Sequence, residues 1–135
     1  MSKVTLLFLF GLVAVASSRS LLQGWGAGDS DTAGGGGDLT IDPWTLGQNF
    51  ADRTASVGDT VTFTWDQGNH GVYRIPSGEC PPSFEDGQNG QNEIQAAVPG
   101  PMTVTYTFEE SGTYWFACPV DGHCDGGMLF KVDVQ

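Results

Sequence analysis

Residues 112–134 read GTYWFACPVDGHCDGGMLFKVDV, and their pattern predicts two strands joined by a loop. Tyr114, Phe116 and Cys118 recur at every second position, so they lie on one face of the first strand. The second strand carries its apolar side chains with the same period, at Met128, Phe130, Val132 and Val134. Cys118 therefore ends one inward-facing row of side chains, and Met128 begins the next.

The loop between these strands gathers three potential metal donors. Antiparallel strands joined at one end bring Cys118 and Met128 close together, and the nine residues between them include His123. A thiol, an imidazole and a thioether suit copper, above all where a second imidazole completes a His2Cys plane and Met is a weak axial ligand. The second imidazole must come from His70, because the chain has only two histidines.

Short strands separated by turns continue through the rest of the chain. The segment TVTFTW at residues 60–65 alternates threonines with Val61, Phe63 and Trp65, which is typical of a half-buried strand. Further strands are expected at residues 39–41, 70–75 and 102–108. Because no helical period is evident after the first residues, the pattern predicts an all-β fold, a Greek-key β-sandwich.

Two segments of this domain do not read as strands. Residues 49–53 are ambiguous between a short helical turn and a loop. Residues 76–93 are rich in Pro, Gly, Asn and Ser, with Cys80 near their start, and predict a long loop over one end of the domain. Trp44 is expected to pack into the core.

The first residues have the composition of a secretory signal peptide. An apolar run at residues 4–16 follows Lys3 and ends in Ala14-Val15-Ala16, so residues 1–18 are expected to be a signal peptide that is cleaved on export. Residues 19–38 are Gly-rich and predict a flexible linker, followed by a single domain at 39–135. No hydrophobic tail follows Val134, so we expect a secreted, extracellular protein without a C-terminal anchor or a membrane span.

The charge of the chain restricts its partners. Without residues 1–18 there are 16 acidic against 4 basic residues, a formal charge of −12. So acidic a domain is a poor match for nucleic acid or anionic membranes. We expect a monomer whose charged partners present a basic surface.

The cysteine count is odd. The chain has three cysteines, Cys80, Cys118 and Cys124, whereas an exported protein usually pairs them. The unpaired thiol is therefore buried, joined to another chain or held as a metal thiolate.

Several segments together resemble one known family. Val57-Gly58-Asp59, residues 69–73 (NHGVY) and residues 114–128 (YWFACPVDGHCDGGM) are similar to the phytocyanins, a branch of the blue-copper cupredoxins. The resemblance covers residues 39–135 and implies one type 1 copper ion bound by His70, Cys118, His123 and Met128. It further implies a disulfide between Cys80 and Cys124, and the methionine at the axial position resembles the plantacyanin and uclacyanin types.

These residues favour electron transfer over catalysis. The leading hypothesis is one-electron transfer by Cu(II)/Cu(I) cycling with a small redox protein or small molecule, with the edge of His123 as the electron port and the Gly71 amide as a donor to the Cys118 sulfur. An enzyme is not expected, because copper oxidases need further histidines and none remain. The alternatives are a secreted, non-redox binding module on the same fold, and a structural zinc site using Cys80, Cys118, His123 and Cys124.

Overall fold

The computed structural model describes residues 37–135. The predicted signal peptide (1–18) and the predicted linker as far as residue 36 lie outside the described residues. Within 37–135, no helix is long and apolar enough to cross a membrane.

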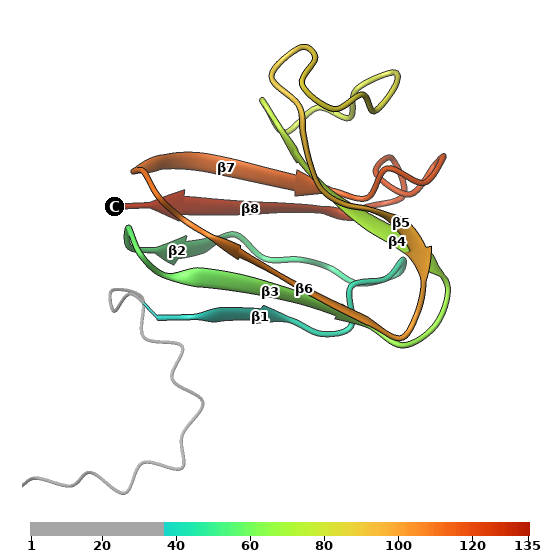
Figure 1. The fold of residues 1–135 in the computed structure, drawn as a ribbon, viewed down its shortest axis with the longest axis horizontal. Coiled ribbons are helices and arrows are strands. Elements are labelled where there is room, and N and C mark those ends of the chain that lie inside the picture. Colours follow the sequence, from blue (N-terminus) through green and yellow to red (C-terminus); the bar gives the residue numbers. More distant parts are fainter. Residues whose placement is uncertain (1–36) are drawn as a thin grey trace, which may run out of the picture. The chain divides into compact units, whose positions relative to one another are not determined.

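Eight strands form two sheets within this region (Figure 1). The three-stranded sheet has the order β1 (Leu39–Ile41), β3 (Thr60–Trp65) and β6 (Met102–Thr107). The five-stranded sheet has the order β2 (Arg53–Ala55), β8 (Leu129–Val134), β7 (Gly112–Ala117), β4 (Asn69–Ile75) and β5 (Asn92–Pro99). Along the chain only two consecutive pairs, β4 with β5 and β7 with β8, stay within one sheet, and every other connection crosses from one sheet to the other. The predicted all-β sandwich is confirmed.

The core lies between the two sheets and follows the alternation of the sequence. In β3, Val61, Phe63 and Trp65 are buried, while the intervening threonines point outward and face threonines of β6. In β7 and β8 the inward rows are also buried, and the Phe116 ring lies 5.3 Å from Phe63 across the sandwich. Aromatic contacts of this kind add to the hydrophobic stabilisation of the core. Trp44 is fully buried among these rings, as expected.

Two strands, β2 and β5, were not expected from the sequence. β5 has no regular alternation of buried and exposed residues, and only its pairing with β4 reveals it as a strand. β2 is three residues long, lies at a sheet edge parallel to β8, and begins at the last residue of the ambiguous segment 49–53. Both strands owe their conformation to a partner that is distant in sequence, which single-chain periodicity does not report.

Three connecting segments meet at the end of the sandwich opposite the C-terminus (Figure 1). They are the segment after β1, the turn between β3 and β4, and the loop between β7 and β8. Residues of all three line one surface groove, which includes Leu46, Gly68 and Val120. The predicted donors lie at this end of the sheets.

Candidate metal centre

Three of the four predicted donor residues converge at this end. The Nδ1 atoms of His70 and His123 are 3.2 Å apart, and the Cys118 Sγ atom lies 3.9 Å from the first and 3.4 Å from the second. Among residues 37–135, this is the group of His, Cys, Asp or Glu side chains that is close enough to share a metal ion. The structure therefore brings His70 to the loop although it lies 48 positions before Cys118 in the sequence.

The spacing of the three atoms fits a single metal ion. By triangle geometry, the point equidistant from them lies about 2.0 Å from each, within the range of about 2.0–2.3 Å over which imidazole and thiolate bind zinc, a first-row metal of similar size. No carboxylate belongs to the group, and a His2Cys plane is the donor set of blue-copper sites. The chemistry and the spacing of the donors suit type 1 copper.

His70 is held in place by a turn and by its strand. It is the second residue of β4 and is 4% exposed. Gly68, two residues earlier, lies against its ring, because a Cβ added at Gly68 would be 2.8 Å from the His70 Nε2 atom. Burial lowers the pKa of His70, and the charge of His123 lowers that pKa further. Both effects favour the neutral imidazole, which is the form that binds a metal.

Cys118 directly follows β7 and is fully buried. Burial raises the pKa of its thiol, while hydrogen bonds from the backbone amides of Gly71 and Val120 oppose that rise in pKa. The predicted contact between the Gly71 amide and the sulfur is confirmed. The second donor, Val120, was not expected from the sequence, because only the folded loop shows that the chain turns back toward the sulfur two residues after Cys118.

Backbone hydrogen bonds close the loop that carries His123. The Met128 amide donates to the His123 carbonyl at 2.9 Å, and the Cys118 amide donates to the Met128 carbonyl at 3.2 Å. The His123 amide in turn donates to the Val120 carbonyl at 3.0 Å. Met128 is fully buried, and its backbone links the other two predicted donors of the loop.

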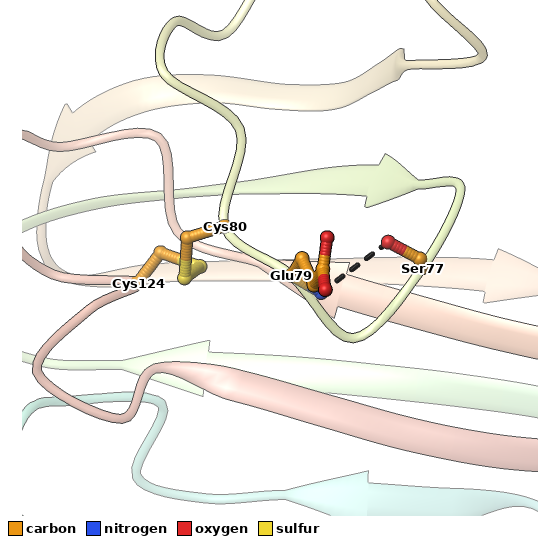
Figure 2. Close-up of a disulfide and its surroundings, with 4 residues drawn as sticks. All are labelled: Ser77, Glu79, Cys80 and Cys124. Atoms are coloured by element: carbon orange, nitrogen blue, oxygen red, sulfur yellow. Dashed lines mark hydrogen bonds between the residues drawn. A yellow bond between two sulfur atoms is a disulfide. The ribbon is translucent and has the colours of Figure 1, made fainter.

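A disulfide ties this loop to the long loop between β4 and β5. Cys80 and Cys124 are bonded, as the family resemblance implies, and Figure 2 shows the bridge beside Glu79, whose amide is hydrogen-bonded to the Ser77 hydroxyl. Cys118 is the free cysteine and is buried. The alternative zinc site is wrong, because Cys80 and Cys124 are joined as a disulfide and offer no thiolates.

A groove of about 400 Å³ opens beside both histidines. Its other lining residues are uncharged: Thr45, Leu46, Gln67, Gly68, Asn69 and Val120. His123 is half-buried at its rim. Within the donor cluster, the Cys118 sulfur is thus shielded from solvent, and the histidine side chains are the part that borders the surface groove.

A β-sandwich with a buried thiol and two imidazoles converging at one end defines the cupredoxin class of domain. The chain belongs to the family described as the plastocyanin-like domain, whose model matches residues 38–128. The predicted resemblance to phytocyanin-type blue-copper proteins is confirmed.

Relatives of known name are moderately similar. The chain is 27% identical over 96 residues to the blue copper protein of Pisum sativum, with 68% of this chain and 47% of that protein covered. It is 28% identical over 108 residues to chemocyanin of Lilium longiflorum, with 75% and 71% covered. The chain therefore spans about half the length of the pea protein. Among solved structures, auracyanin of Roseiflexus castenholzii matches with a TM-score of 0.49 and 25% identity, covering 73% of this chain and 95% of that one.

Proposed function

We propose that this protein is a secreted electron carrier with one type 1 copper ion, held by His70, Cys118 and His123 with Met128 as the axial ligand. The observation that carries the proposal is the convergence of two Nδ1 atoms and one buried Sγ atom within 3.9 Å of one another. When bound there, copper supplies one-electron chemistry by alternating between Cu(II) and Cu(I).

The surrounding residues favour a fixed site. Cys118 is shielded from solvent, two backbone amides are directed at its sulfur, and the disulfide anchors the residue next to His123. A site that keeps its geometry in both oxidation states loses little energy to rearrangement when the electron moves. We infer that the protein acts as a carrier and not as an enzyme, because His70 and His123 are the members of the donor cluster that line the groove, and the buried Cys118 sulfur is not among its lining residues.

Absorption spectroscopy tests the metal assignment. Addition of Cu(II) to the copper-free domain should produce an intense visible thiolate-to-copper band, and Cys118→Ser should abolish it. The Cys80→Ala/Cys124→Ala variant is the matched control: it also removes cysteine side chains, but none that faces the histidines, and should keep the band. A colourless native protein, or a coloured Cys118→Ser variant, would contradict the proposal.

The electron should enter or leave through the groove beside His123, and charge should select the partner. The loop that carries His123 (residues 118–128) and the loop that the disulfide ties to it (residues 76–91) contain five carboxylates and no Lys or Arg: Glu79, Glu85, Asp86, Asp121 and Asp125. A small redox protein or molecule with a basic surface therefore fits best.

Small redox reagents of opposite charge test this selection. The reaction with hexaammineruthenium, a cation, should slow as salt is added, whereas the reaction with ferricyanide, an anion, should accelerate. Equal salt dependence for the two reagents would reject a role for these carboxylates.

The second candidate is a secreted, non-redox binding module on the same fold. The groove favours it, because its uncharged lining would accept a small neutral ligand without metal. A protein that stays colourless with Cu(II) yet shows a saturable partner interaction, unaffected by Cys118→Ser, would establish this alternative. Secretion itself is tested by expressing the full chain in a eukaryotic host and sequencing the N-terminus of the exported protein, with cleavage expected within residues 16–18.

A further inference from the structure

Gly71 lies where β4 has left its pairing with β7. The register between these strands runs only from Tyr73 to Ile75, and the pairing of β4 with β5 shifts on both sides of Val72. The backbone groups of Gly71 therefore have no register partner on either strand. They find other partners: the amide is hydrogen-bonded to the Cys118 sulfur, and the carbonyl accepts a hydrogen bond of 2.9 Å from the Trp44 indole.

Gly71 has little room to move. An added Cβ would lie 2.7 Å from the Gln95 carbonyl oxygen and 2.8 Å from the Ala97 nitrogen, so the backbone of β5 packs directly against this residue. The Trp44 indole then fixes the carbonyl. The direction of the Gly71 amide is set by these two contacts, because the bulge has removed the usual ladder bonds.

Trp44 is itself rigidly held, and it belongs to the other side of the sandwich. Its amide donates to the Thr64 carbonyl in β3 at 2.7 Å, and its ring lies 5.1 Å from Phe63 and 4.8 Å from Phe50. Its side chain is fully buried. Because Trp44 is packed so tightly against β3, its hydrogen bond to the Gly71 carbonyl fixes the position of β4, the strand that carries His70, relative to β3.

We propose that Trp44 is a positioning residue of the redox site. Its indole N–H holds the Gly71 carbonyl, and through it keeps the Gly71 amide directed at the Cys118 sulfur. This inference rests on the proposed electron-transfer function. The indole N–H of Trp44 contacts none of the four predicted ligands, so Trp44 would act on the site through Gly71. A hydrogen bond to the sulfur withdraws electron density from it and so favours the reduced form of the loaded site.

Replacing the indole with a ring that lacks the N–H isolates this role. In Trp44→Phe the Gly71 carbonyl loses its buried donor, so hydrogen exchange of the Gly71 amide in the copper-free protein should accelerate roughly tenfold. In the copper-loaded protein, the reduction potential should fall and the thiolate-to-copper band should shift.

Trp65→Phe is the matched control. Trp65 is equally buried, and its indole donates to the Val98 carbonyl at 3.1 Å, so the same chemical group is lost without touching Gly71. This variant should lose similar stability to urea, while its Gly71 exchange rate stays at the native value. The Trp65 ring lies 6.2 Å from the His70 ring, so the exchange rate, and not the reduction potential, is the quantity compared between the two variants. If both variants accelerate the Gly71 exchange alike, or if Trp44→Phe leaves it unchanged, the proposal is overturned.

A second variant keeps the test decisive if Trp44→Phe does not fold. Benzothienylalanine at position 44 preserves the shape of the indole and lacks only the N–H, and it should give the same faster exchange and lower potential. The exchange measurement needs no copper, so it tests the link between Trp44 and Gly71 even if the protein binds none. A protein that binds copper but keeps its potential in either variant would refute the positioning role alone.

Discussion

Removing the disulfide between Cys80 and Cys124 should strongly destabilise the domain. The bridge joins residues 44 positions apart, and in the chain-entropy model a loop of this length lowers the free energy of folding by about 4 kcal/mol at 25 °C. That is a large share of the roughly 5–15 kcal/mol by which small domains are stable.

Most of this loss of stability should come from the greater conformational freedom of the unfolded chain, because in the folded protein the long loop keeps its other native contacts. The Phe84 ring packs against Tyr73 at 5.4 Å, and the buried Gln91 side chain bonds to the backbone of Ser83 and Glu85 at 3.1 Å each. We therefore expect Cys80→Ala/Cys124→Ala to fold with the same structure and to unfold at a lower urea concentration.

Urea unfolding of the copper-free protein measures the loss. With an m-value of about 1.5 kcal/mol/M, the midpoint should fall by roughly 2–3 M. Cys118→Ala is the control: it deletes one buried sulfur without removing a cross-link and should cost about 1 kcal/mol. Reduction of the native protein with dithiothreitol changes no residue and should reproduce the larger loss. A loss below about 1 kcal/mol on reduction would refute the reasoning.

The same variant tests what the bridge does for the proposed function. If the disulfide stops the His123 loop from relaxing when copper changes charge, electron self-exchange should be slower without it. Equal self-exchange rates in the native and double-alanine proteins would show that the bridge contributes stability only.

Gly68→Ala should weaken Cu(II) binding, because the new methyl group would lie 2.8 Å from the His70 Nε2 atom. Gly47→Ala is its control: both glycines have φ near +80°, so both variants carry a backbone strain of about 1–2 kcal/mol, but only the first meets His70; equal affinities would contradict the prediction. Burial, with the hydrogen bond to Glu93 next, raises the pKa of Tyr73 from 10.0 to about 12. The stability that this shift represents is present below pH 10 and is lost as the pH rises toward 12, since the unfolded chain releases the proton first. Tyr73→Phe should remove that part of the alkaline decline in urea titrations, and an unchanged decline would argue against it.

Much of the fold follows from local patterns. Alternation located β1, β3, β6, β7 and β8, because one face of each strand packs on the core and every second residue is therefore apolar. β4 was located instead by the loop residues before it and by Pro76 after it, and it does not alternate, because consecutive residues are buried on both of its faces. The sequence also predicted that Cys118 and Met128 lie close together, because Cys118 comes at the end of one strand and Met128 at the start of the next, and these two strands are neighbours. β2 and β5 did not follow, since an edge position and a bulged pairing leave no periodic signal.

The sequence by itself determined the kind of chemistry available, a thiol, two imidazoles and a thioether, and it placed three of these donors on one loop. Only the tertiary structure decided that His70 approaches Cys118 to 3.9 Å, that Val120 also donates to its sulfur, and that the Trp44 indole caps the carbonyl of Gly71. The physical reason is that periodicity specifies which face of a strand is buried. The order and register of strands distant in sequence arise from packing the whole chain, and they decide which buried atoms meet.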